Sequence, residues 1–210
     1  MKVLINEYKK KRTQIKKRLK EFKDLSQAKD EDIFRELCFC ILTPQTKAIC
    51  CDKAVKELKE SGLLFKGDKD AISKKLKGFV RFHNNKAAYI VAARRFFRDG
   101  NGLDIKNKLD TRDILKTREW LVKNIKGLGY KEASHFLRNI GFGKGMAIID
   151  RHILKNLIHY GVIKEMPSSI SRKMYREIEN KINKFSQSIK IPIEELDLLF
   201  WSSQTGFIFK

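Results

Sequence analysis

Apolar residues recur with the spacing of an α-helix along almost the whole chain, and this periodicity is the strongest constraint on its fold. No segment shows a convincing alternation of apolar and polar residues, the pattern of a half-buried β-strand. Pro44 and several glycines, among them Gly62 and Gly78, end the periodic segments, and the chain has only 3 prolines. The sequence therefore predicts an all-α protein.

The predicted helices suggest one unit built of two lobes. A lysine-rich amphipathic helix is expected over 2–24, and an almost wholly apolar one over 30–42, as in the centre of a core. Further helices are expected over 46–62, 70–78, 84–102, 111–124, from 130 onward, 148–161, 168–189 and 192–205. Because no flexible linker or repeat interrupts them, residues 1–210 should form a single unit of two helical lobes. The middle helices, about 30–125, would form one lobe; the N-terminal helix and 126–210 would form the other.

The chain carries a large excess of positive charge. It has 46 Lys and Arg residues against 25 Asp and Glu, a net charge of +21 at pH 7. Such an excess favours a polyanionic partner, because side chains that neutralise phosphates release condensed counterions. Nucleic acid fits better than a membrane surface, since the basic residues flank no apolar anchor. A thermophile's lysine-rich surface is the alternative, although its charges should balance.

Nothing in the sequence indicates a membrane, a metal or a cofactor. No apolar run approaches the roughly 20 residues that span a bilayer, and the start of the chain lacks the core of a signal peptide. We therefore expect a cytoplasmic protein, associated with the nucleoid if its partner is DNA. The cysteines are Cys38, Cys40, Cys50 and Cys51. No Cys-x-x-Cys pair or nearby histidine completes a zinc set, so buried free thiols are expected.

In residues 125–141, IKGLGYKEASHFLRNIG, two glycines at 127 and 129 interrupt the helical pattern. A helix, a tight Gly-Leu-Gly turn and a second helix predict a helix–hairpin–helix over about 112–141. Gly127 and Gly129 can adopt positive φ and let a phosphate approach the backbone, while the first N–H groups of the second helix point at it. With Lys126 they form a predicted phosphate site that holds DNA without reading its sequence. An ordinary turn between helices is the alternative.

A lysine and an aspartate follow the hairpin. Lys131 lies directly after the glycines, and Asp150, in AIIDRHIL, begins a later helix. One helix and one loop separate them, long enough for the chain to return to the hairpin. An amine and a carboxylate that meet there could act on a nucleotide flipped out of a duplex. Asp150 is also a favourable N-cap residue, so a capping role is an alternative that can coexist with the first.

These segments resemble a known enzyme group. KGLGYKEASHFLRNIGF and AIIDRHIL are similar to the helix–hairpin–helix DNA glycosylase superfamily, and look like its archaeal type-2 8-oxoguanine DNA glycosylases. CILTPQTKA, GFVRFHNNKAAYIVAAR and LDLLFWSSQTGFIFK extend the resemblance, which covers the chain from about 30 to 210. It implies the two-lobed helical glycosylase fold, and a monomer acting on double-stranded DNA that contains a damaged base.

The resemblance also implies an activity. Lys131 matches the family's catalytic lysine, which attacks the sugar C1′ as the base leaves and forms a Schiff base. Asp150 matches the residue that stabilises positive charge on the sugar. A Schiff base permits β-elimination, so a bifunctional 8-oxoguanine DNA glycosylase/AP lyase is expected. The alternatives are a glycosylase/lyase for another oxidised base and a non-catalytic helix–hairpin–helix DNA-binding module, which needs neither Lys131 nor Asp150.

Four residues are expected to contact the extruded base or the gap that it leaves. A flipped purine needs aromatic faces around it, and Phe82 and Trp201 are the candidates, with core packing as the alternative. The resemblance gives the C-terminal carboxylate, here that of Lys210, a part in recognising the base. Gln45 is expected to enter the gap, with a plain surface position as the alternative. Neighbouring polar residues are candidate phosphate or opposite-strand contacts, or a solvated basic face: Arg81, His83, Asn84 and Lys86.

The positions of the cysteines separate this chain from other branches of the superfamily. Some members hold an iron–sulfur cluster with four cysteines near their C-terminus. Here every cysteine precedes residue 52, so no such cluster is expected. This departure disfavours the substrates of the endonuclease III and adenine glycosylase branches.

Overall fold

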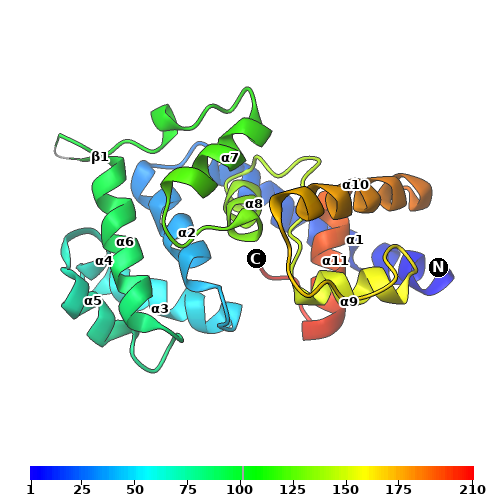
Figure 1. Ribbon diagram of the computed structural model, residues 1–210, viewed down its shortest axis with the longest axis horizontal. Helices are drawn as coiled ribbons and strands as arrows, with labels where there is room; N and C mark the ends of the chain where they lie inside the picture. Colours follow the sequence, from blue (N-terminus) through cyan, green and yellow to red (C-terminus); the bar gives the residue numbers. More distant parts are fainter. Residues whose placement is uncertain (101) are drawn as a thin grey trace. The chain divides into compact units, whose positions relative to one another are not determined.

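A computed structural model describes residues 1–100 and 102–210, and over these residues the regular secondary structure is almost entirely α-helical (Figure 1). The prediction of an all-α protein is confirmed. The exceptions within the described residues are a short antiparallel strand pair, β1 (Arg98–Asp99) and β2 (Gly102–Leu103), and a 3-10 turn, η1 (Lys106–Lys108). The helices are α1 Lys2–Leu25, α2 Asp30–Leu42, α3 Ala48–Glu60, α4 Leu63–Lys66, α5 Lys69–Leu76, α6 His83–Phe97, α7 Ile114–Asn124, α8 Tyr130–Asn139, α9 Arg151–His159, α10 Arg172–Ile189 and α11 Ile193–Thr205.

The chain divides into two compact units. Leu25–Phe136 form one, called here the middle unit; Met1–Asp24 and Leu137–Lys210 form the other, the terminal unit. The division falls inside α8, whereas the sequence analysis placed it near residue 126. The first part of α8 is held by middle-unit partners: Ser134 Oγ accepts from Arg118 of α7 at 3.1 Å, and the His135 ring lies 5.5 Å from that of Phe39. The hairpin therefore belongs to the middle unit.

Helix α2 forms the centre of the middle unit. Three acidic residues in its first turn, Asp30, Glu31 and Asp32, favour a helix start by complementing the helix dipole. From Ile33 to Leu42 nearly every side chain is buried, as its apolar sequence predicted. Helices α3 and α6 pack against it (Figure 1). Helix α2 ends at Leu42: Thr43 still has helical backbone angles, φ −68° and ψ −30°, but Pro44 has no N–H with which to continue the helix.

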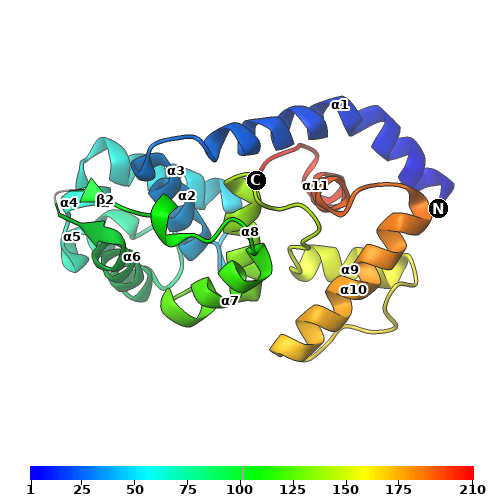
Figure 2. The ribbon, with the colours of Figure 1, turned by 90° about the horizontal axis from the view of Figure 1, so that it is seen from above.

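The terminal unit gathers α9, α10 and α11 with the N-terminal helix α1 (Figure 2). Helix α11 packs against α9 and α10. Two polar contacts join distant parts of the sequence: Tyr8 donates to Glu195 at 2.6 Å, and Arg138 pairs with Asp197 at 2.9 Å. Because both contacts are largely removed from water, they fix α1 and the end of α8 to α11 more firmly than surface pairs would.

Candidate active site and DNA-binding hairpin

The turn between α7 and α8 is a tight hairpin with a buried apolar base. Ile125 and Leu128 are 2% and 5% exposed, so the side chains on either side of residues 126–127 are buried. Gly127 lies between them with φ +89°, a conformation that side chains rarely adopt. A Cβ there would also lie 2.6 Å from Cδ2 of Tyr89. Lys126 is exposed beside this glycine, so the hairpin offers both bare backbone and a cation.

Gly129 differs from the expectation. Its φ is not positive, so the prediction that both glycines use left-handed conformations is wrong for this residue. Its N–H instead donates to Oε2 of Glu132 at 3.2 Å. This is the reciprocal bond of a capping box, in which the third helical residue closes the helix start. The acidic side chain also suits the positive end of the α8 dipole.

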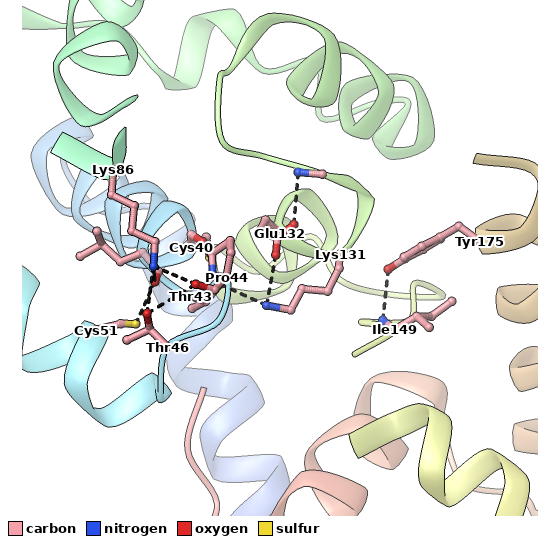
Figure 3. Close-up of polar contacts among 12 residues, drawn as sticks. Cys40, Thr43, Pro44, Thr46, Cys51, Lys86, Lys131, Glu132, Ile149 and Tyr175 are labelled. Carbon is pink, nitrogen blue, oxygen red and sulfur yellow. Dashed lines mark hydrogen bonds and ion pairs between the residues drawn. The ribbon is translucent and has the colours of Figure 1, made fainter. Parts of the chain in front are cut away.

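Lys131 lies in the first turn of α8, with its side chain 23% exposed. Its Nζ donates to Oγ1 of Thr43 at 3.1 Å and lies 3.4 Å from Oε1 of Glu132 (Figure 3). The Thr43 hydroxyl donates its own hydrogen to the carbonyl oxygen of Cys40 at 2.8 Å. It therefore presents only lone pairs to the lysine. The amine is thus held at the hairpin by two oxygens, with part of its surface open to solvent.

Asp150 is the N-cap of α9, so the capping role that its residue type suggested is present. Its Oδ1 accepts from the N–H groups of His152 and Ile153, both at 2.8 Å. The cap uses only one carboxylate oxygen. The preceding segment is fixed by Tyr175, whose hydroxyl accepts from Ile149 N at 3.2 Å and donates to Ala147 O at 2.7 Å.

Gln45 and Phe82, both in the middle unit, share an uncommon backbone conformation. Each is exposed, Phe82 at 53%, and their φ angles are +55° and +57°. For a residue with a Cβ this left-handed conformation costs roughly 1–2 kcal/mol, and such strain tends to mark functional positions. The Arg81 guanidinium lies 5.5 Å from the Phe82 ring centroid. Neither residue is part of the core, the alternative considered for Phe82.

Trp201 lies in α11 of the terminal unit and is half-buried by the tail that follows it. The ring of Phe209 stacks with it at 6.0 Å, and that of Phe207 meets it edge-on at 5.4 Å. Sequence reasoning missed both phenylalanines. Their signal was the spacing of two in GFIFK, which places alternate side chains of an extended tail on one face. Lys210 ends this tail and is partly exposed.

Lys86 is the clearest correction to the sequence analysis. It was a candidate phosphate contact, yet it is only 3% exposed. Its Nζ donates to Leu42 O at 2.7 Å, Pro44 O at 2.8 Å and Thr46 Oγ1 at 2.9 Å. An ammonium has three N–H donors, so none is left for a phosphate. Burial lowers the pKa of this lysine.

The other candidates beside Phe82 are more accessible. His83 Nδ1 lies 2.9 Å from Ser73 Oγ, which also bonds Asn84, so these two residues tie α6 to α5. Arg81 is exposed. Of the cysteines, Cys38, Cys40 and Cys51 are buried free thiols, as expected, while Cys50 is partly exposed. Among the described residues, no group of three or more His, Cys, Asp or Glu could hold a metal ion. No helix in the described part of the chain is long and apolar enough to cross a membrane.

Comparisons with known proteins agree on one family. The family model described as 8-oxoguanine DNA glycosylase matches residues 15–191. A Fusobacterium nucleatum protein named 8-oxoguanine DNA glycosylase/AP lyase is 46% identical over 97% of this chain and 94% of its own length. A Methanocaldococcus jannaschii protein of the same name is 42% identical over 93% of this chain and 91% of its own.

Solved structures show the same fold. The M. jannaschii 8-oxoguanine glycosylase/lyase in complex with DNA containing 8-oxoguanine is 38% identical and matches with a TM-score of 0.88, over 99% of this chain and 100% of its own. The Thermotoga maritima 8-oxoguanine DNA glycosylase is 32% identical, with a TM-score of 0.88 over 100% of this chain and 97% of its own. These matches confirm the predicted glycosylase fold. The chain belongs to the 8-oxoguanine DNA glycosylase family.

Proposed function

We propose that this protein is a DNA repair enzyme that excises 8-oxoguanine from duplex DNA through a Schiff base on Lys131, and then cleaves the abasic strand by β-elimination. The observation that carries the proposal is the position of Lys131. Its amine is partly exposed in the first turn of the hairpin helix, within a chain of the 8-oxoguanine DNA glycosylase family. A non-catalytic binding hairpin has no need of a lysine held in this way.

The hairpin would hold the damaged strand. Gly127 lets the turn keep its left-handed backbone against the Tyr89 ring, and Lys126 adds an exposed cation beside it. A phosphate bound there would place the neighbouring sugar near the start of α8. The net charge of +21 would add affinity that does not depend on sequence. One copy of the chain carries every proposed site residue, so we propose that it acts as a monomer on chromosomal DNA.

The chemistry follows from an amine at that position. Neutral Lys131 Nζ attacks C1′, and the bond to the base breaks with its electron pair going to the base, which takes up a proton. The amine loses its protons, the C1′–O4′ bond opens with protonation of O4′, and a Schiff base results. This imine acidifies the C2′ hydrogens. Loss of one of them expels the 3′ phosphate, and water then releases the lysine.

Asp150 would stabilise the positive charge that develops on the sugar as the base leaves. Its cap uses Oδ1 alone, which leaves Oδ2 outside the capping bonds. In our proposal Phe82 and Trp201 supply aromatic faces for the extruded base, and Gln45 fills the gap in the duplex. The Lys210 α-carboxylate would accept from N7–H of 8-oxoguanine, a donor that guanine lacks.

Borohydride trapping tests this proposal. The protein is mixed with a duplex containing one 8-oxoguanine, and the Schiff base is reduced to a stable covalent adduct. The natural chain and Lys10→Gln should form the adduct, since Lys10 is an exposed residue of α1. Lys131→Gln should form none. If adducts form only with DNA that carries a different oxidised base, that base is the substrate in place of 8-oxoguanine. Tight DNA binding without any adduct would favour a non-catalytic binding module.

A further inference from the structure

The three acceptors of Lys86 follow a regular order along the chain. They belong to Leu42, the last residue of α2, and to Pro44 and Thr46, that is, to every second residue from the helix end into the turn that follows. The Lys86 ammonium therefore holds the residues on both sides of Thr43 and of Gln45. Figure 3 shows the Lys86 ammonium on one side of this turn and Lys131 on the other.

Thr43 is the member of the turn that reaches Lys131. Its hydroxyl hydrogen is committed to Cys40 O, so its oxygen accepts from Lys131 Nζ. This bond fixes the direction of one N–H group of the amine, and hence limits where the nitrogen lone pair can point. A shift of the turn would move Thr43 Oγ1 and therefore change the orientation of the Lys131 amine.

Gln45 and the segment before Phe82 depend on the same turn. Gln45 keeps its left-handed conformation between two residues that Lys86 holds, which offsets the strain described above. Thr46 Oγ1 also accepts from Arg81 N at 3.2 Å, next to Phe82. The Lys86 ammonium thus bonds directly to both neighbours of Gln45. It is linked to Arg81 through Thr46, and it holds the two residues that flank Thr43, the partner of Lys131.

On this geometry we propose that Lys86 is a positioning residue for base excision, which aligns the Lys131 amine through Thr43 and orients Gln45 through Pro44 and Thr46. The inference rests on the proposed function, because it concerns the same reaction. Lys86 itself touches neither DNA nor the reacting atoms. Its effect passes through the turn of residues 42–46.

The test is a double-mutant cycle on the rate of borohydride trapping, with enzyme saturating over a duplex that carries one abasic site. This substrate reports on Lys131 without the step of base recognition. Lys86→Met removes the cation and keeps most of the buried stem; Thr43→Val removes the hydroxyl and keeps its shape. Each should slow trapping about tenfold or more, because small misplacements of a reacting group are costly. The double variant should trap DNA no more slowly than the slower of the two single variants, because Lys86 acts on Lys131 through Thr43.

Arg94→Met is the matched control. Arg94 lies in the same helix, α6, and its guanidinium also gathers carbonyl oxygens, those of Leu63, Leu64 and Gly67. Burial lowers its pKa, as it does for Lys86. Its loss should therefore weaken folding, measured by urea unfolding, without slowing the trapping reaction of the folded protein.

Each outcome decides the inference. If Lys86→Met traps as fast as Arg94→Met, or if the losses of the two single variants simply add, Lys86 is structural only and the inference is overturned while the proposed function stands. If the natural chain itself traps no DNA, both are overturned. Should Lys86→Met not fold, Thr46→Val decides, since it removes one acceptor and leaves the cation: slower trapping supports the inference, and an unchanged rate overturns it.

Discussion

The ring of Tyr89 occupies the space that a side chain on Gly127 would need. A Cβ at residue 127 would lie 2.6 Å from Tyr89 Cδ2, closer than such atoms approach, and the residue holds φ +89°. Two independent constraints therefore require glycine at the tip of the hairpin. A residue with a side chain would have to displace an aromatic ring of α6 and adopt a strained backbone at once.

Gly127→Ala should accordingly weaken DNA binding. We expect at least a tenfold rise in Kd for a duplex containing 8-oxoguanine, from strain of about 1–2 kcal/mol plus the clash. Fluorescence anisotropy in a Lys131→Gln background measures Kd without turnover. Gly62→Ala is the control, because Gly62 has φ +71° with nothing within 4 Å of the added Cβ. It should lower stability alone, and unchanged Kd for Gly127→Ala would contradict a phosphate site at this turn.

Substitutions at Asp150 can separate its two roles. Asparagine keeps an oxygen acceptor for the cap and removes the charge, whereas alanine removes both. Excision should slow about a hundredfold in both variants, since one electrostatic stabiliser of the transition state is lost. Stability should fall by about 1 kcal/mol in Asp150→Ala only. Single-turnover rates and urea unfolding give the two quantities, and normal excision by Asp150→Asn would leave the residue as a cap alone.

The C-terminal carboxylate is testable by extension of the chain. Two glycines added after Lys210 move the α-carboxylate by up to about 7 Å. Excision of 8-oxoguanine should slow, because the carboxylate no longer meets N7–H, while trapping on abasic DNA should be unchanged. The same glycines placed before Met1 are the control. Equal excision by both extended chains would remove the carboxylate from base recognition.

Tyr8 should make stability fall at high pH. Burial, and then the neighbouring Glu195 carboxylate, raises the pKa of its phenol to about 12 from 10.0. The folded state thus holds this proton more tightly than the unfolded chain does. The resulting stabilisation is complete below pH 10, and about 2 kcal/mol should be lost as pH rises from 10 to 12. Urea unfolding of the natural chain and Tyr8→Phe measures it, and parallel pH curves would refute this linkage.

Features with local signals could be predicted from the sequence. The all-α class follows from periodicity, and the hairpin from its glycines between two amphipathic helices. The N-cap at Asp150 follows from residue type and the apolar helix behind it. In each case the residues that determine the structure lie within a few positions of one another, so the sequence contains the relevant interaction directly.

Long-range contacts were not predictable in this way. Thr43 and Lys131 are 88 positions apart, and no spacing rule joins them. Lys86 looked like one more cation of a basic surface, and only packing shows that its ammonium is enclosed by carbonyl oxygens. Residue type alone cannot separate a buried lysine from an exposed one. The boundary of the middle unit inside α8 was not predictable for the same reason, since it depends on contacts of α8 with α2 and α7.

The burial of three cysteines has a chemical consequence if the enzyme acts on oxidised guanine as proposed. Peroxides attack the thiolate, so a thiol that keeps its proton is a poor target. Burial raises the pKa of Cys51 to about 12, and that of Cys38 above its usual range, while Cys40 is fully enclosed. Oxidative conditions that damage guanine would thus leave these three sulfurs largely intact, and repair capacity would persist when lesions are most frequent.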